Sequence, residues 1–313
     1  MINVNDKYVR VRWNGTLSAS VSVKSGVRQG GSLSPALFNV FVNDSINNVK
    51  KSGKGCNIDD FYLGIIMYAD DILLLSPTVL GLQKQMDICG EYFTNCRLDF
   101  NASKSVCLAF GPAHGYNIKP MLLQGGSISW VKSFKYLGIV FKAGKNISVD
   151  IEPIKRKFYA SCYSIFGKTA HIDELTRLYL LEVNCLPLLT YALPALSLSQ
   201  ENIRELNVAW NSAYRKIFAF NRWDSVKSFI AGLGKLDFKH IRLKLCTTFV
   251  SDNIGSFNGP FNHLLFRYYV SDFINIWRKD VSTSDHPKLH IVHYSHHYIS
   301  QIIQDSFKLS SGI

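Results

Sequence analysis

Two segments of the chain carry the pattern of a β-hairpin. Residues 8–23 alternate between apolar and polar side chains around Asn14-Gly15, a dipeptide that favours the left-handed backbone of a type I′ turn. Residues 65–68 and 72–75 are short apolar runs separated by Ala69-Asp70-Asp71, which predicts a second, tight hairpin.

Helical periodicity follows each hairpin. Ser34 and Pro35 predict a helix start, as N-cap and first helical residue, and a second helix is expected from about Thr78. In both segments apolar residues recur three or four positions apart, which gathers them on one face. These positions are Phe38, Phe41, Val42 and Ile46 in the first helix, and Leu82, Met86, Cys89 and Phe93 in the second.

The pattern changes near Gly144. Before it we expect a strand at 105–110 and two more within 127–141, with a turn near Lys132-Ser133. After it, the period is helical as far as about Phe220. The sequence therefore predicts an α+β fold. Its expected parts are a mixed sheet-and-helix domain (1–145), a helical domain (146–220) and an extension of unknown role (221–313).

The composition indicates a packed globular protein with a polyanionic partner. Hydrophobic residues make up 47% of the 313 residues and charged residues 19%, which argues against a disordered chain. The formal net charge of +12 favours nucleic acid as the partner; a generally basic surface is the alternative. The seven scattered cysteines lack the short spacings of zinc sites, so we interpret them as core residues of a reducing compartment. Neither a secretory start nor an apolar run near the ~20 residues of a membrane span is evident, so we expect an intracellular protein, nuclear or cytoplasmic.

The acidic pair Asp70-Asp71 is the first candidate for chemistry. It lies between two apolar runs, and two unpaired carboxylates repel each other, so such a pair normally needs a cation. Mg²⁺ suits the pair, because one or two carboxylates and substrate phosphates typically hold this ion; Mn²⁺ is a second option. A solvated turn is the alternative, and it is our interpretation of the similar pair Asp59-Asp60.

A glycine-rich loop from Gly26 to Pro35 is the second candidate. Its glycines allow the backbone to approach a ligand closely, and the helix N-terminus that follows is an anion site. Arg28 adds a charged donor and Gln29 a hydrogen-bonding amide. Taken alone, the loop is equally well an ordinary helix cap.

The two candidates in this order resemble the reverse transcriptases, most closely the polymerases of non-long-terminal-repeat retrotransposons. Residues 29–35 resemble the family's Gln-Gly-x-x-x-Ser-Pro segment, and residues 68–71 its Tyr-x-Asp-Asp turn on the catalytic palm. Residues 100–105 resemble its Asn-x-x-Lys segment, and residues 134–138 its Tyr-Leu-Gly primer-grip hairpin. The resemblance extends over residues 8–220 and implies a polymerase palm, an antiparallel sheet with packed helices, followed by a helical thumb-like domain.

The resemblance also implies RNA-templated DNA synthesis by two-metal phosphoryl transfer, with an RNA template, a DNA primer and deoxynucleoside triphosphates as partners. Asp70 would be a metal ligand, with Asp71 secondary. The residues implied to bind nucleotide and template are Arg28, Gln29, Gly30, Ser34, Pro35, Tyr68 and Lys104, the last near the triphosphate. Those implied to grip the primer are Tyr136, Leu137 and Gly138. For the basic residues, a solvated surface charge is the alternative.

A basic stretch in the expected thumb is the third candidate. Between Lys132 and Lys168 there are eight lysines or arginines against two acids. Lys155, Arg156 and Lys157 are adjacent on an expected helix that would contact duplex phosphates, with binding that weakens steeply as salt rises. A solvated helix face is the alternative.

The sequence departs from the family before Gln29. Family members carry their principal metal-binding aspartate there, whereas Asp6 is the sole acid among these 28 residues and lies outside any apolar strand. The fingers are missing as well. We therefore expect an N-terminally truncated enzyme with little or no activity alone, for which a partner chain could supply fingers. The alternatives are a module that binds nucleic acid without copying it, and a degraded copy without function.

Five of the nine histidines lie near the end of the chain. A spacing of three and four residues would allow a metal site, but no cysteine lies nearby. We interpret this segment as a surface helix or strand. The histidines are His286, His290, His293, His296 and His297.

Overall fold

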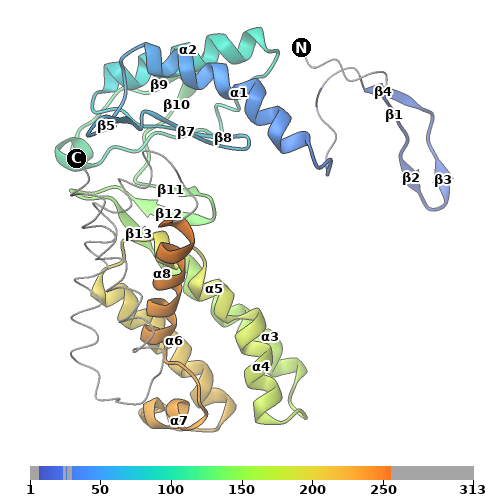
Figure 1. The fold of residues 1–313 in the computed structure, drawn as a ribbon, viewed down its shortest axis with the longest axis vertical. Helices are drawn as coiled ribbons and strands as arrows, with labels where there is room; N and C mark the ends of the chain where they lie inside the picture. Colours follow the sequence, from blue (N-terminus) through green and yellow to red (C-terminus); the bar gives the residue numbers. More distant parts are fainter. Residues whose placement is uncertain (1–6, 24–25, 27–29, 255–313) are drawn as a thin grey trace. The chain divides into compact units, whose positions relative to one another are not determined.

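The structure, a computed structural model, describes residues 7–23, 26 and 30–254 (Figure 1). Their contacts divide the chain into two units, which are described separately. Unit 1 comprises residues up to 109 together with 115–131, and unit 2 comprises 110–114 and the residues from 132 onward. Both units combine helices with small antiparallel sheets, so the predicted α+β class is confirmed.

Unit 1 begins with the first predicted hairpin. Asn14 and Gly15 have φ angles of 44° and 83°, the two positive values that a type I′ turn requires. The side chains from Tyr8 to Ser20 are all exposed, so turn chemistry rather than burial specifies this hairpin. Its strands pair as β1 (Lys7–Val9) with β4 (Val21–Val23) and β2 (Arg12–Trp13) with β3 (Thr16–Leu17).

The centre of unit 1 is the second predicted hairpin, packed against two helices. β7 (Ile65–Tyr68) and β8 (Asp71–Leu74) pair antiparallel, and α1 (Ser34–Lys51) and α2 (Val79–Asn95) pack against them (Figure 1). The expected apolar faces of both helices are confirmed. The buried residues that the helices and the hairpin share are Val42, Val49, Ile65, Cys89 and Phe93.

The helix starts follow different capping rules. The side chain of Thr78 accepts a hydrogen bond from the backbone N–H of Gly81, as an N-cap of α2 should. Ser34, in contrast, is the first helical residue of α1, and Leu33 occupies the N-cap position. The prediction of Ser34 as N-cap is therefore wrong by one position, while the place of Pro35 in the first turn is confirmed.

Two strand predictions are wrong. Residues 105–110 contribute only a single bridge, between Cys107 and Trp130. The expected turn at Lys132-Ser133 does not form. Instead β10 (Gly126–Ile128) pairs with β9 (Met121–Leu123), and Ser133 begins a strand whose hairpin turns at Leu137-Gly138. Cys107 and Ile128 are buried with Met86 in a second cluster, so the apolar character of residues 105–110 reflects packing rather than a ladder. A further short hairpin joins β5 (Asn57–Ile58) and β6 (Phe61–Tyr62).

Unit 2 is a three-stranded sheet with a helical bundle. The antiparallel order is β11 (Ser133–Tyr136), β12 (Ile139–Lys142), β13 (Ser148–Asp150). The helices are α3 (Glu152–Lys168), α4 (Glu174–Asn184), α5 (Leu186–Thr190), α6 (Gln200–Ile217), α7 (Lys227–Gly232) and α8 (Phe238–Ile254), with single 3₁₀ turns η1 (Gly111–Gly115) and η2 (Leu193–Ala195).

The core of unit 2 joins its sheet to its helices. Val149 of β13 packs against the helical core. Beyond residue 220, the buried side chains of Val226, Ile230 and Phe238 belong to the same core. The helical part therefore continues through α8. The histidine-rich segment lies outside the described residues.

The stretch Glu174–Ala195 is long and apolar enough to cross a membrane by length and composition alone, a feature that the sequence analysis missed. It is not one continuous helix, because α4 ends at Asn184 and Ala192 adopts a left-handed φ of 56°. Leu181 and Leu189 are fully buried in the core of unit 2. Other apolar side chains of the stretch are exposed, among them Leu175 and Val183, and 28% of its most apolar window is buried within the described residues.

The prediction that the cysteines are core side chains holds for most of them, whereas Cys56 and Cys96 are half-buried. All seven are free thiols and five are buried. Burial raises the pKa of Cys89 to about 12 and that of Cys107 to about 11, so neither is a thiolate near neutral pH.

Candidate functional site

The acidic pair lies at the tip of the β7–β8 hairpin. Tyr68 pairs with Asp71 in the ladder, so Ala69 and Asp70 form a two-residue turn. Ala69 has a φ of 51°, a left-handed conformation that costs a residue with a Cβ about 1–2 kcal/mol. Strained backbone of this kind persists only where the flanking structure enforces it, here the paired strands on both sides.

Both carboxylates are exposed to solvent, together with Tyr68 and Ala69. The apolar side chains of the two strands, among them Ile65 and Met67, face the core with α1 and α2 instead. The hairpin is therefore buried at its base and open at its tip, although the pair lies between two apolar runs in the sequence. The tip presents two adjacent carboxylates that water and a substrate phosphate can reach.

The pair supplies only part of a metal site. Within the described residues, no three His, Cys, Asp or Glu side chains lie close enough together to hold an ion. Mg²⁺ is commonly bound through one or two carboxylates, with waters and substrate phosphates as the other ligands. Asp70 and Asp71 fit this donor set, since both are exposed oxygen ligands on adjacent residues.

Buried polar contacts fix the base of the acidic hairpin to both helices. The Gln85 amide of α2 donates hydrogen bonds to the carbonyl oxygen of Gly64, at 2.8 Å, and to the hydroxyl of Tyr62, at 3.3 Å. A Cβ at Gly64 would lie 2.2 Å from that hydroxyl, so a larger residue there would displace the Tyr62 side chain. On the α1 side, the buried hydroxyl of Ser45 lies 3.7 Å from the Met67 sulfur. Contacts with both helices therefore hold the base of the hairpin in place.

The glycine-rich loop is described only in part, since Arg28 and Gln29 lie outside the described residues. Gly30 has a φ of 77°, and a Cβ added to it would meet no described atom within 4 Å, so backbone conformation rather than crowding favours glycine. Ser34 and Pro35 open α1. The loop thus leads into a helix N-terminus, as predicted.

Lys104 belongs to a turn that Asn101 organises. The Asn101 side-chain oxygen accepts hydrogen bonds from the hydroxyl of Ser103, at 2.6 Å, and from the backbone N–H of Lys104, at 3.2 Å. The Asn101 carbonyl oxygen accepts one from the backbone N–H of Ser105, at 3.0 Å. The side chain of Lys104 is exposed. The Asn-x-x-Lys pattern therefore has a local physical reason: the asparagine shapes the turn that presents the lysine.

The turn of the β11–β12 hairpin holds the residues predicted to grip a primer. Leu137 and Gly138 have φ angles of 45° and 86°, which makes this a type I′ turn that follows Tyr136. Tyr191, after α5, contacts the turn from 54 positions along the chain. No local sequence pattern links Tyr191 to this turn, so the contact could not be predicted.

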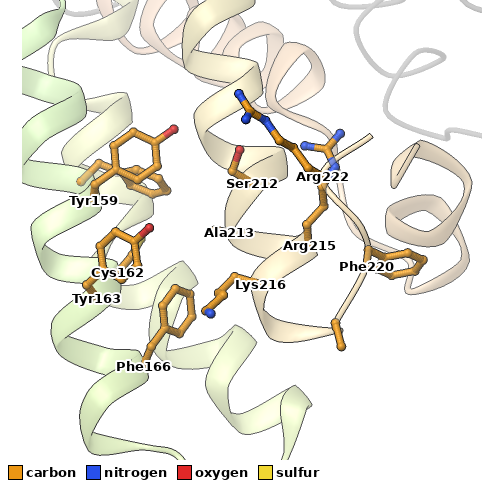
Figure 2. A pocket seen from close by; sticks show the side chains of 12 residues that line it. Tyr159, Cys162, Tyr163, Phe166, Ser212, Ala213, Arg215, Lys216, Phe220 and Arg222 are labelled. Atoms are coloured by element: carbon orange, nitrogen blue, oxygen red, sulfur yellow. The ribbon is translucent and has the colours of Figure 1, made fainter. Parts of the chain in front are cut away.

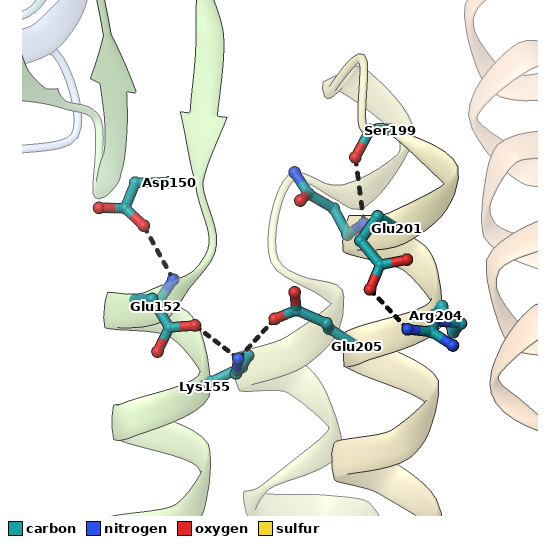
Figure 3. Close-up of polar contacts among 8 residues, drawn as sticks. Asp150, Glu152, Lys155, Ser199, Glu201, Arg204 and Glu205 are labelled. Carbon is teal, nitrogen blue, oxygen red and sulfur yellow. Dashed lines mark hydrogen bonds and ion pairs between the residues drawn. The ribbon is translucent and has the colours of Figure 1, made fainter.

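The three predicted phosphate-binding residues of α3 differ in their surroundings. The ammonium group of Lys155 lies 2.5 Å from a carboxylate oxygen of Glu152 and 2.6 Å from one of Glu205, and its side chain is 19% exposed (Figure 3). Hydrogen bonds to Glu152 and Glu205 raise the pKa of Lys155. Its charge joins α3 to α6, whereas Arg156 and Lys157 are exposed.

The predicted site residues are thus divided between the two units. Unit 1 holds the acidic turn, the start of α1 and Lys104, and unit 2 holds the β11–β12 turn and the basic residues of α3. Each group forms an ordered local structure within its own unit.

Comparison with known proteins finds a family match over residues 2–141, which is somewhat less than half of the chain. Residues 2–141 match the family model described as reverse transcriptase (RNA-dependent DNA polymerase). The chain is 22% identical over 229 residues to the Retrovirus-related Pol polyprotein from type-1 retrotransposable element R2 of Popillia japonica, an alignment that covers 71% of the chain and 37% of that relative. It is 27% identical over 161 residues to the RNA-directed DNA polymerase from mobile element jockey of Drosophila melanogaster, covering 50% of the chain and 17% of the relative.

A third relative, the type-1 R2 Pol polyprotein of Bradysia coprophila, is 30% identical over 129 residues, or 38% of the chain and 15% of its own length. The chain therefore spans well under half the length of these three relatives. The first alignment, at 229 residues, is longer than the segment 2–141, so similarity to the R2 protein also includes residues outside that segment.

Proposed function

Because this chain carries, in residues 2–141, a reverse transcriptase domain of the kind found in non-long-terminal-repeat retrotransposons, we propose that it takes part in RNA-templated DNA synthesis by two-metal phosphoryl transfer. One observation carries the proposal. Two adjacent carboxylates, Asp70 and Asp71, are exposed at the tip of a hairpin whose base is fixed to two helices. A Mg²⁺ or Mn²⁺ ion held there would lower the pKa of the primer hydroxyl and neutralise charge on the transferred phosphate.

In this proposal the residues of unit 1 position the nucleotide. Asp70 is the main metal ligand of the pair and Asp71 the second. Lys104 brings a positive charge to the triphosphate, where an exposed ammonium on an ordered turn stabilises developing negative charge. Gly30, Ser34 and Pro35 would contact nucleotide and template through the N-terminus of α1, together with Arg28, Gln29 and Tyr68.

The residues of unit 2 would hold the primer and the duplex. The type I′ turn at Tyr136, Leu137 and Gly138 is a compact, ordered feature that could contact the primer end. Arg156 and Lys157 would contact phosphates of the duplex, as a polymerase thumb does. Lys155 is less suited to that role, because two carboxylates already neutralise its charge.

The acidic turn can be tested without requiring DNA synthesis. The full chain is mixed with a primed RNA template, and retention of the next labelled deoxynucleoside triphosphate is measured with and without Mg²⁺. We expect Mg²⁺-dependent retention that Asp70→Asn weakens at least about tenfold, since one charged ligand is lost. Asp60→Asn is the matched control, because Asp59-Asp60 is also the two-residue turn of a hairpin. Equal retention by the Asp70 and Asp60 variants would overturn the proposal.

A non-catalytic nucleic-acid-binding role is the second candidate. The net charge of +12 and the exposed Arg156 and Lys157 favour it. The same experiment separates the two roles. A chain that binds the primed template in a salt-sensitive manner but retains no nucleotide with Mg²⁺ would belong to the second.

A further inference from the structure

A groove lies between α3 and α6 of unit 2. Its volume is about 460 Å³, within the range of about 300–1,000 Å³ that is usual for ligand sites. One wall is formed by α3 and the other by α6 with the loop that follows it (Figure 2). Every lining residue belongs to unit 2, and none is among the residues assigned above to catalysis, primer or duplex.

The wall on α3 is aromatic. Tyr159, Tyr163 and Phe166 are spaced four and three positions apart, so they lie on one face of the helix and point into the groove (Figure 2). Tyr163 is 64% exposed, and its ring meets that of Phe166 edge-on with 6.2 Å between the centroids. Water therefore reaches an aromatic surface large enough to stack on a flat ligand.

The wall on α6 and its loop is cationic. Arg215, Lys216 and Arg222 line it, and none of the described residues that line the groove is acidic (Figure 2). The Nε of Arg215 donates a 2.8 Å hydrogen bond to the carbonyl oxygen of Asp224, which orients the guanidinium group. The guanidinium of Arg222 lies 5.0 Å from the ring centroid of Trp223, which is 85% exposed. The ligand should therefore carry negative charge.

We propose that this groove binds an unpaired nucleotide of single-stranded nucleic acid, with the base against the tyrosines of α3 and the phosphates against the cations of α6. Aromatic stacking combined with a basic backbone track is the usual chemistry of single-strand binding. A base inside a duplex is already stacked between its neighbours, so it cannot use the aromatic wall. An acidic peptide would use the cations and leave that wall without a role.

Photocrosslinking tests where the base lies. The full chain is irradiated with a single-stranded RNA of about 15 nucleotides that carries one 5-iodouracil, and the adducts are mapped by mass spectrometry. We expect adducts on the tryptic peptide 158–168, which contains Tyr159, Tyr163 and Phe166. Adducts confined to other peptides would overturn the proposal.

Two matched tyrosines test the stacking itself. Tyr163→Ala should weaken binding of the same RNA about tenfold, measured by fluorescence anisotropy at fixed salt. Tyr179→Ala is the control, because Tyr179 on α4 is 63% exposed, almost the same as Tyr163, and does not line the groove. Thermal unfolding of both variants establishes that they are folded. Equal affinities for the two variants would refute stacking.

An abasic oligomer of equal length separates stacking from charge. Its affinity should be unchanged by Tyr163→Ala and lowered by Lys216→Ala, since only its phosphates remain. If Tyr163→Ala affects the abasic and normal oligomers alike, the proposal fails. The proposals for the groove and for the acidic turn are tested independently. Asp70→Asn should leave the crosslink intact, and Tyr163→Ala should leave Mg²⁺-dependent nucleotide retention intact.

Discussion

The hydroxyl of Tyr191 donates a 2.9 Å hydrogen bond to the carbonyl oxygen of Leu137, in the turn of the β11–β12 hairpin. The tyrosine ring also lies against the next residue, since a Cβ at Gly138 would be 3.2 Å from it. A residue just after α5 thus fixes the predicted primer-grip turn to the helical part of unit 2. The hydrogen bond and the close approach both depend on a turn with two positive φ angles.

Gly138→Ala should lower the free energy of unfolding of unit 2 through two separable effects. A left-handed backbone costs alanine about 1–2 kcal/mol, and the new methyl group would push the Tyr191 ring by a few tenths of an ångström and weaken its hydrogen bond, for up to about 1 kcal/mol more. Urea unfolding followed by tryptophan fluorescence would measure the loss.

Gly234→Ala is the control for the backbone effect, because Gly234 has a φ of 68° and no described atom within 4 Å of its Cβ position. In a Tyr191→Ala background, Gly138→Ala should lower the free energy of unfolding by no more than Gly234→Ala does in the parent chain. If Gly138→Ala lowers it as much in that background as in the parent chain, Tyr191 does not restrain the turn.

The three adjacent basic residues of α3 should differ in their effect on nucleic-acid binding. Arg156 and Lys157 are exposed, so each can contact a phosphate and release its counterion. Replacing both with alanine should therefore reduce the slope of log affinity against log salt by about 2. Lys155→Ala should leave that slope nearly unchanged and lower stability by up to about 1 kcal/mol, because its ion pairs join α3 to α6. Anisotropy titrations on a primed duplex at several salt concentrations would measure the slopes. A larger slope change for Lys155→Ala than for the double variant would contradict this assignment.

The stability of unit 2 should decline in acid because of Asp237, which precedes α8. Burial raises the pKa of this carboxyl, but hydrogen bonds from the side chain and backbone N–H of His240 outweigh burial and hold the pKa below its ordinary value. A depressed pKa contributes stability above the unfolded pKa of about 3.9, and this is lost as pH falls through the folded value.

Asp237→Asn should therefore make the melting temperature less sensitive to pH between about 5 and 3, while the asparagine still accepts the backbone hydrogen bond at the helix start. At pH 7 the melting temperature of the variant should be a few degrees lower. In a unit of this size, each kcal/mol of lost unfolding free energy lowers the melting temperature by about 2–4 °C. Differential scanning calorimetry across this pH range would measure both effects. An unchanged acid decline in the variant would assign the acid sensitivity to other groups.

Local patterns were enough to predict the hairpins and the main helices. Asn14-Gly15 specifies a type I′ turn by itself, and the spacing of Leu82, Met86, Cys89 and Phe93 specifies the buried face of α2, because both depend on residues close in sequence. The order of four motifs indicated the family, which the match to residues 2–141 then confirmed.

Tertiary structure decided which of these residues are buried, which are paired and which are exposed. The sequence could not reveal that Asp70 and Asp71 are exposed, that Glu205 binds Lys155, or that Tyr191 contacts Leu137. Nor could it reveal that an aromatic face of α3 meets three cations from α6 and its loop. Each of these depends on side chains brought together by folding from positions far apart in the chain, or on which face of an element the core covers, and neither is encoded in a local period or motif.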